Sequence, residues 1–267
     1  MSEREYSRES PTPAQEEQSP PIDRDPMPRG FTSFVDSMPA SYRATFQGDA
    51  IAAHAAIAAR RGASAARVEL WKELPERVVA ICVVADDRPG LLSRVSAALV
   101  AHDIDIVAAQ AYCRTRADLE TEAVDLLWIR RLPGASGSSS PIRVRDVARI
   151  GETLDALVRG RASFEVAVRL ARAIRSAAAS TRVRFEEHGR EHGTVLTIEA
   201  DDRPGLLLVV TRALFREGVQ IVGSRVSTEE GRAIERFVVA ELDGAPLRSS
   251  RLLALQTAVL VAIEDAG

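Results

Sequence analysis

The sequence predicts an α+β protein made of two ferredoxin-like sandwiches in tandem, preceded by a disordered N-terminal tail. The first observation behind this prediction is that the heptapeptide Asp-Asp-Arg-Pro-Gly-Leu-Leu occurs twice, at residues 86–92 and at residues 201–207. The second is that period-two alternation, typical of strands, occurs in the segments that precede each copy. The third is an amphipathic helical stripe directly behind each copy. A repeat at this spacing indicates two copies of one structural unit.

The N-terminal part divides into a tail and a leading helix. Residues 1–40 hold seven of the thirteen prolines and few large apolar side chains, so we expect a disordered tail there. Residues 41–65 are assigned to a leading helix, because the alanine-rich segment 49–60 has helical spacing and Gly62 is placed to end it.

The two modules are assigned to residues 66–160 and 181–267, with a connecting helix across residues 161–180 and a flexible loop at residues 136–140. Each module reads as four strands interleaved with two helices. The helices must cover one face of a four-stranded antiparallel sheet, which describes a ferredoxin-like sandwich. The helical stripe of the first copy recurs in the second, as Leu91, Leu92, Val95, Ala98 and Leu99 matched to Leu206, Leu207, Val210, Ala213 and Leu214.

Alternation within one strand of each module makes a prediction about the other face of the sheet. The second copy places Thr197 and Glu199 at the alternate positions, as expected for a half-exposed sheet, whereas the first copy places Cys82 and Val84 there. We therefore expect the leading helix or another sheet to cover that face of the first module. Exposed Cys82 and Val84 side chains would refute this.

Composition excludes several classes of function. The net charge is −3, from 35 basic and 38 acidic residues spread along the chain, so we expect no nucleic-acid partner. Apolar runs are shorter than the roughly 18 residues that span a bilayer, and no hydrophobic signal segment is visible, so we expect no membrane partner and a cytoplasmic location. The two cysteines, Cys82 and Cys113, are interpreted as free buried thiols.

The repeated turn has two interpretations from its residues alone. Pro89 and Pro204 fix φ for a first helical turn, Gly90 and Gly205 permit close backbone approach, and the preceding aspartates are able to cap the helix. The turn is thus a well-made helix start. Alternatively, free backbone N–H groups behind the proline bind a ligand carboxylate while an aspartate accepts an ammonium group, which together recognise a free α-amino acid.

Asp-Arg-Pro-Gly-Leu-Leu between a strand and a helix resembles the signature of the ACT domain, a small module that binds amino acids where paired copies meet. Further segments are similar to the C-terminal third of the bacterial PII uridylyltransferase family, whose chains end in two tandem ACT modules. These segments are Thr181-Arg182-Val183-Arg184-Phe185, Ala233-Ile234-Glu235-Arg236-Phe237, and Met38-Pro39-Ala40-Ser41-Tyr42 with Ile51 and His54. In that family the pair senses glutamine and switches the enzyme between uridylyl transfer and uridylyl removal.

The resemblance implies that ligand contacts come from the repeated turn of one copy and from the next strand of the facing copy. It places Asp87, Gly90, Leu91 and Leu92 in one half-site and Asp202, Gly205, Leu206 and Leu207 in the other, with Ile104, Val107, Val219 and Val222 as pocket walls. It further implies nitrogen regulation, with a PII-type protein or a nucleotidyltransferase as partner. A homodimer is left open.

Two motifs imitate catalytic sites. Asp103-Ile104-Asp105 has the spacing of a nucleotidyltransferase metal site, but no Gly-Ser loop precedes it, so we interpret it as a turn. His102-Asp103 resembles the dyad of metal phosphohydrolases, yet His54, His188 and His192 supply no ligand set. We therefore expect no catalytic residues, no metal and no cofactor.

Three hypotheses follow from these observations. The first is a non-catalytic amino-acid sensor with allosteric output. The second is the regulatory part of a uridylyltransferase-type enzyme whose catalytic domains lie elsewhere. The third is a protein-interaction module that has lost its ligand.

Overall fold

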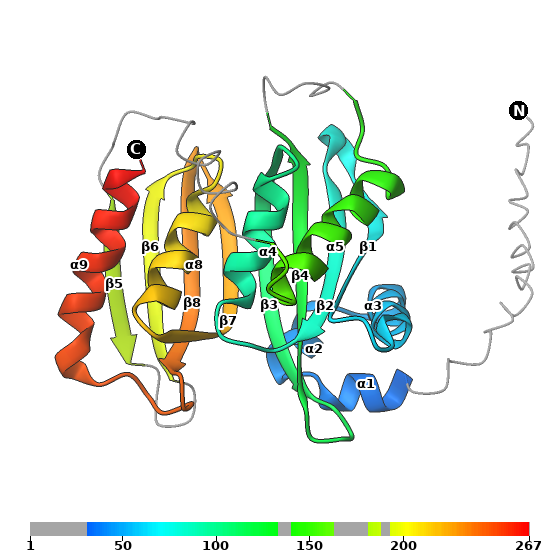
Figure 1. Cartoon of the computed structure of the whole chain (residues 1–267), viewed down its shortest axis with the longest axis horizontal. Coiled ribbons are helices and arrows are strands. Elements are labelled where there is room, and N and C mark those ends of the chain that lie inside the picture. The colour runs from blue at the N-terminus through cyan, green and yellow to red at the C-terminus, as the bar shows by residue number, and fades with distance from the viewer. Residues whose placement is uncertain (1–30, 133–139, 163–180, 188–192, 267) are drawn as a thin grey trace, which may run out of the picture.

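A computed structural model describes residues 31–132, 140–162, 181–187 and 193–266, and contains one antiparallel sheet of eight strands (Figure 1). The first half consists of α1 (Phe31–Ser37), α2 (Ala40–Thr45), α3 (Gly48–Arg61), β1 (Ala66–Glu73), the 3-10 helix η1 (Pro75–Arg77), β2 (Val79–Asp86), α4 (Leu91–Val100), β3 (Ile104–Thr115), β4 (Thr121–Arg131) and α5 (Val144–Val158). The second half consists of β5 (Arg182–Glu187), β6 (Thr194–Asp201), α8 (Leu206–Arg216), β7 (Val219–Glu229), β8 (Arg232–Glu241) and α9 (Ser249–Asp265).

The sheet has the order β1-β2-β4-β3-β7-β8-β6-β5, so each half contributes four neighbouring strands in the same internal order. The halves meet where β3 pairs with β7, with Ala109 opposite Val226 and Ala111 opposite Ser224. The predicted α+β class is confirmed, but the halves share one sheet instead of forming two separate ones. Pairing β3 with β7 satisfies backbone groups that two open edges would leave exposed.

The main core lies between the sheet and helices α4, α5, α8 and α9, which cover one face (Figure 1). Its completely buried members come from both halves and include Ile81, Leu99, Leu127, Leu196, Leu214 and Phe237. The amphipathic stripes predicted from the sequence therefore face the sheet.

The other face of the first half is covered by α1, α2 and α3, which confirms the prediction made from Cys82 and Val84. Both side chains are completely buried, in a second apolar cluster that contains Tyr42 of α2 and Ile57 of α3. Gly62 ends α3 with φ of +57°, as the sequence predicted. Helices α1, α2 and α3 therefore cover an apolar face of the sheet that would otherwise be exposed to solvent.

The expected tail at residues 1–40 is too long. Helix α1 occupies Phe31–Ser37, and Phe34 and Met38 are 3% and 2% exposed within the second cluster. Composition suggested disorder because it does not reveal that these few apolar side chains meet an apolar sheet face. Residues 1–30 lie outside the described residues. So do the predicted connecting helix from residue 163 to residue 180, most of the loop at residues 136–140, and His188 and His192.

We call the turn at residues 87–90 the first corner and the turn at residues 202–205 the second corner. Helices α4 and α8 begin after these turns, with Gly90 and Gly205 as N-cap residues in the left-handed conformation, at φ of +76° and +81°. Neither helix has a side-chain cap, so the predicted capping by the aspartates is wrong. The prolines lie two residues before the first helical residue, which leaves the glycine as the residue that reverses the chain.

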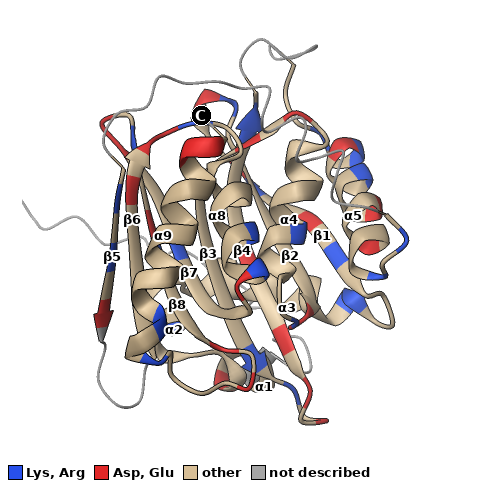
Figure 2. Cartoon of the chain, turned by 60° about the vertical axis from the view of Figure 1, so that its left-hand side comes forward, with Lys and Arg blue, Asp and Glu red and all other residues tan. Residues whose placement is uncertain are grey.

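Charges of both signs are interspersed over the surface in Figure 2, without a stripe of one sign. Within the described ranges, no helix has the length and apolar character that crossing a bilayer requires.

Candidate ligand sites at the two corners

The two corners lie against opposite ends of one pair of helices. Helices α4 and α8 are neighbours at the centre of the molecule (Figure 1), and the first corner, which precedes α4, touches Phe215 near the C-terminal end of α8. The second corner, which precedes α8, shares a cavity with Val100, the last residue of α4. The halves are therefore related by an approximate two-fold axis that exchanges the two corners.

Each corner borders a small cavity of about 20 Å³. The first is lined by Asp87, Arg88, Gly90, Leu91, Leu92, Ala111, Cys113, Ala123 and Asp125 of the first half and by Thr211, Phe215, Val219, Ile221 and Val222 of the second. The other is lined by Asp202, Arg203, Gly205, Leu206, Leu207, Leu208, Val226, Thr228, Ala233 and Glu235 of the second half and by Ser96, Val100, Ile104, Asp105 and Ile106 of the first.

The structure gathers eleven of the twelve predicted ligand residues around these cavities. Those at the first are Asp87, Gly90, Leu91, Leu92, Val219 and Val222, and those at the second are Asp202, Gly205, Leu206, Leu207 and Ile104. Val107 lines neither cavity, although its counterpart Val222 lines the first and both strands have an irregularity at this position. Ligand binding itself remains a prediction.

Backbone donors at each corner are only partly used. The amide of Leu91 donates to the carbonyl oxygen of Arg88 at 3.0 Å, and the amide of Leu206 donates to that of Arg203 at 3.2 Å. Among the described residues, no backbone carbonyl accepts from the amides of Gly90 or Leu92. Since these amides belong to a helix N-terminus, they retain the capacity to bind an anion.

Little room is left beside the corners. A Cβ atom on Gly90 would lie 2.7 Å from the ring of Phe215, so that side chain packs directly on the glycine. A cavity of about 20 Å³ holds a single water molecule and not an amino acid. Arg94 covers the outer side of the same ring, with its guanidinium carbon 5.5 Å from the ring centroid.

Each cavity contains a buried carboxyl group that the motif analysis missed. Asp125 and Glu235 are 3% and 1% exposed, and they occupy matching positions on β4 and β8. Burial, reinforced by Asp87, raises the pKa of Asp125 to about 8, and burial, reinforced by Asp202, raises the pKa of Glu235 to about 8. Oε2 of Glu235 has no hydrogen-bond partner among the described residues. The available signal was an acidic residue at a core-facing strand position in both copies.

The corner aspartates also have partners of their own. Burial raises the pKa of Asp87, which receives a hydrogen bond from Gln220 Nε2 of the facing half at 3.5 Å. Oδ2 of Asp202 accepts a hydrogen bond from Thr228 Oγ1 at 3.1 Å. Asp105 takes the place of Gln220 at the second cavity, so that site carries one more carboxyl group than the first.

The two motifs that resemble catalytic sites, Asp103-Ile104-Asp105 and His102-Asp103, have structural roles. Asp105 forms an ion pair with Arg130, with Oδ2 2.9 Å from Nη2, and Asp103 ends the turn after α4 with φ of +57°. Nε2 of His102 lies 2.8 Å from Thr153 Oγ1 of α5, and Nδ1 of His54 lies 2.8 Å from the hydroxyl oxygen of Tyr42. In the described part of the chain, no group of three or more metal-binding side chains is arranged around a common point. Cys82 and Cys113 are free thiols, the former buried.

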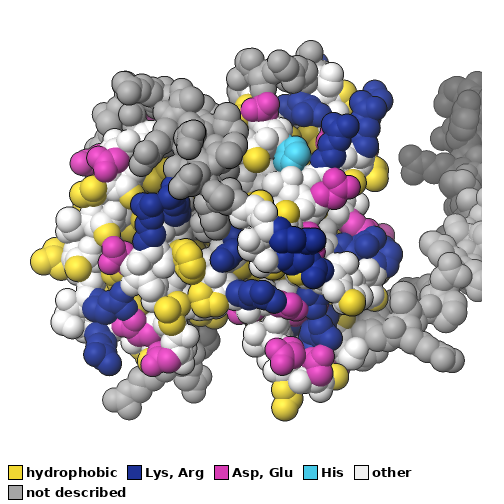
Figure 3. Space-filling view, in the orientation of Figure 1, with side chains coloured by type: hydrophobic (Ala, Val, Ile, Leu, Met, Phe, Trp, Pro, Cys, Tyr) yellow, Lys and Arg dark blue, Asp and Glu magenta, His cyan; other side chains and the backbone are white. Residues whose placement is uncertain are grey.

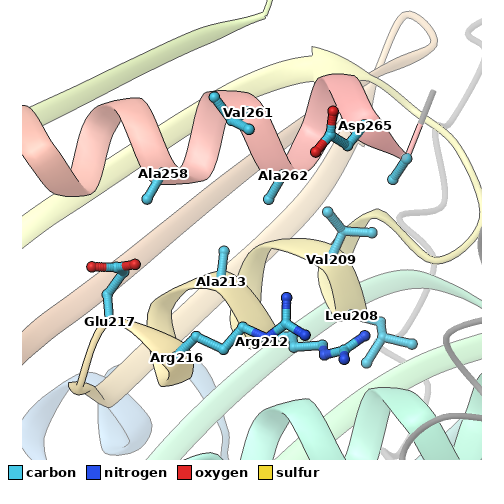
Figure 4. A pocket seen from close by; sticks show the side chains of 11 residues that line it. Leu208, Val209, Arg212, Ala213, Arg216, Glu217, Ala258, Val261, Ala262 and Asp265 are labelled. Atoms are coloured by element: carbon cyan, nitrogen blue, oxygen red, sulfur yellow. The ribbon is translucent and has the colours of Figure 1, made fainter.

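A larger groove of about 290 Å³ lies between α8 and α9 and shares Leu208 with the second cavity. Figure 4 shows Ala258 and Ala262 of α9 pointing towards Val209 and Ala213 of α8 across this groove. Arg212 and Arg216 of α8 also line this groove, whereas the repeated turns contribute no residue to it.

Comparison with known proteins gives one consistent result. The chain is similar to the bifunctional uridylyltransferase/uridylyl-removing enzymes of Phenylobacterium zucineum (29% identity over 238 residues), Bradyrhizobium sp. (31% over 197) and Caulobacter vibrioides (24% over 251). These matches cover 87%, 71% and 91% of this chain, but 24%, 20% and 25% of the relatives. The chain is thus homologous along most of its length to about a quarter of each enzyme.

No family model matches the chain. Among solved structures, aspartate kinase from Synechocystis aligns over 71% of this chain and 40% of its own, with a TM-score of 0.19 and 12% identity. That likeness is too weak to bear on the fold.

Proposed function

We propose, from the homology of this chain to one part of bifunctional uridylyltransferase/uridylyl-removing enzymes, that it is a regulatory unit without catalytic machinery. Its two halves act as a pair of ACT-type modules that bind a free amino acid, glutamine in the first instance, at the corners. The observation that carries the proposal is the position-by-position match of the two cavities, each built from the corner of one half and the next strand of the other.

The chemistry of each corner suits a zwitterion. At the first corner the amides of Gly90 and Leu92, at the positive end of the α4 dipole, suit a carboxylate. Asp87 and Asp125 suit an ammonium group, because a cation stabilises two buried carboxyl groups in their charged form. Asp202 and Glu235 offer the same pairing at the second corner.

A ligand of this size requires the structure to open. The cavity of about 20 Å³ must expand by moving Phe215 off Gly90 and separating α8 from the first corner. Ligand binding is then favourable only in an arrangement of the two halves that differs from this closed one. Ligand binding then changes the arrangement of the two halves, which a partner protein detects. The coupling free energy expected between ligand binding and this rearrangement is about 1–3 kcal/mol.

Calorimetric titration of the whole chain with each of the twenty amino acids tests the proposal. We expect binding by at least one of them, and loss of binding in the double variant Asp87→Asn/Asp202→Asn. Asp36→Asn, at an exposed position of α1, is the matched control and should bind like the unchanged chain. An analogue that lacks the α-amino group should bind at least tenfold more weakly. Absence of binding to all twenty at 10 mM contradicts the sensing function.

A second candidate is a protein-interaction module without a ligand, and the filling of the first corner by Phe215 favours it. Phe215→Ala separates the two. For a sensor, removing the ring opens the first site and increases the affinity for the amino acid. For an interaction module, the variant leaves the chain unresponsive to amino acids, while association with a PII-type protein, a nucleotidyltransferase or a second copy of the chain persists in co-purification.

A further inference from the structure

A basic cleft lies on the first half, next to the first corner but outside its cavity. It is shallow and open to solvent, and its charged lining residues are Arg61, Asp86, Arg88, Arg116, Arg159 and Arg161. The arginines come from four places in the chain, namely the end of α3, the first corner, the β3–β4 hairpin and the segment after α5. Figure 3 shows Lys and Arg side chains gathered over the first half near the end of α5.

The inner wall of the cleft contains an ion-pair network. Nη1 of Arg61 lies 2.7 Å from Asp86 Oδ1, and its Nε lies 3.0 Å from Oε1 of the buried Glu122. Glu122 also accepts a hydrogen bond from Arg114 Nε at 2.8 Å, and Arg88 Nη2 lies 3.1 Å from Asp86 Oδ2. Asp86 and Glu122 therefore hold Arg61 and Arg88 in this wall, while Arg114 lies behind it, over the ring of Phe34.

The outer wall is more exposed and also has an excess of arginine. Arg159 and Arg161 share the single carboxylate of Asp155, at 2.8 and 2.7 Å, and their side chains are 43% and 64% exposed. Arg116 pairs with Asp118 at 2.7 Å. Taken together, five arginines line the cleft, and Asp86 is the one acidic residue among the described residues that lines it with them.

The second half places the counterpart of Arg88 differently. Arg203, the counterpart of Arg88, donates a hydrogen bond to the carbonyl oxygen of Ile263 in α9 and so does not face an open cleft. Arg88 therefore belongs to the repeated turn, but its surroundings at the cleft differ from those of Arg203.

We propose that this cleft binds a ligand that carries a di- or triphosphate group. Guanidinium groups bind phosphate oxygens in pairs of hydrogen bonds, and the cleft is open to solvent, so a charged phosphate chain reaches it without losing all of its hydration. A phosphate chain supplies negative charge next to the five arginines that line the cleft. Arg88 directly follows Asp87, so a ligand that draws Arg88 away from Asp86 acts on the same turn that forms the first corner.

Calorimetric titration of the whole chain with inorganic pyrophosphate and with ATP, at 50 mM NaCl, tests this site. We expect dissociation constants below 1 mM that rise with salt concentration. The double variant Arg159→Ala/Arg161→Ala should weaken binding at least tenfold. Arg182→Ala is the matched control, because Arg182 is 61% exposed and loosely paired with Glu199 at 3.7 Å. Thermal unfolding of each variant establishes that it is folded.

Three results would overturn the proposal. They are no detectable binding of either probe at 10 mM, equal binding of sulfate at the same ionic strength, and equal losses in the double variant and the control. If the double variant does not fold, Arg88→Gln replaces it with the same expectation. Failure here leaves the amino-acid proposal intact, because none of these measurements uses an amino acid.

Discussion

Replacing Asp125 by asparagine is predicted to stabilise the chain at pH 8, although it removes a native side chain from the core. Asp125 is 3% exposed on β4, and burial together with the nearby Asp87 raises its pKa to about 8. At pH 8 the unchanged chain must therefore hold a partly ionised carboxyl group in its interior. Asparagine keeps the shape and a hydrogen-bonding side chain but has no charge to bury.

The size of the effect follows from the difference between the native and unfolded pKa. An aspartate in an unfolded chain has a pKa of about 3.9, so between pH 4 and pH 8 the native state keeps a proton that the unfolded state has lost. The free energy of unfolding therefore falls as the pH rises through this window. A shift of about four units corresponds to about 5 kcal/mol, of which about 4 kcal/mol develops between pH 5 and pH 8.

Urea denaturation at pH 5 and at pH 8, followed by circular dichroism, measures this difference. We expect the gain in the free energy of unfolding from Asp125→Asn to be larger at pH 8 than at pH 5, by up to about 4 kcal/mol. Asp36→Asn, at an exposed position, should show the same small change at both pH values. A gain from Asp125→Asn that does not grow with pH would show that the carboxyl group is ionised and stabilised at neutral pH, and would refute the reasoning.

Three further predictions concern the core and the first corner. Burial lowers the pKa of His54 to about 4, so stability should be lost as the pH falls from 6.5 to 4, by about 3 kcal/mol, and His54→Gln should flatten that part of a stability profile. Gly90→Ala should lower the free energy of unfolding by about 2 kcal/mol, because of the φ of +76° and the contact with Phe215. In a double-mutant cycle, the same substitution should cost less when Phe215→Ala has already removed the ring. Equal costs in both backgrounds would argue against that contact. Glu122→Gln should cost about 3–5 kcal/mol in urea denaturation because it removes the buried carboxylate that Arg61 and Arg114 share, whereas Glu69→Gln, at a more exposed ion pair, should cost less than about 1 kcal/mol.

Much of the fold was predictable because its signals are local. Period-two alternation located the strands around Cys82 and Thr197, and the stripe that begins at Leu91 located α4. The cover on this face of the first half was predictable from Cys82 and Val84, since apolar side chains on both faces of a strand require cover on both sides. The C-terminal limit of the tail was not predictable, because the burial of Phe34 depends on a sheet face more than forty residues away in sequence.

Most residues of the candidate site were predictable from the sequence, but the small size of the two cavities was not. The motif indicated both corners and most of their walls, but the role of Gly90 depends on Phe215 of the other half, which packs on it. The aspartates were expected to cap helices, whereas the structure makes the glycines the cap residues. Asp125 and Glu235 belonged to the repeat, but their raised pKa values come from burial that only packing produces.

By itself the sequence determined that the chain is duplicated, that each copy alternates strands with helices, and that one sharp turn occurs at the same place in both. These properties follow from backbone preferences and side-chain periodicity, which act over a few residues. Only the tertiary structure decided that the two copies share one sheet and that residues of the other half complete each corner. It also decided that each small cavity contains a buried carboxyl group. Those features arise from contacts between residues more than one hundred positions apart, whose geometry no local pattern records.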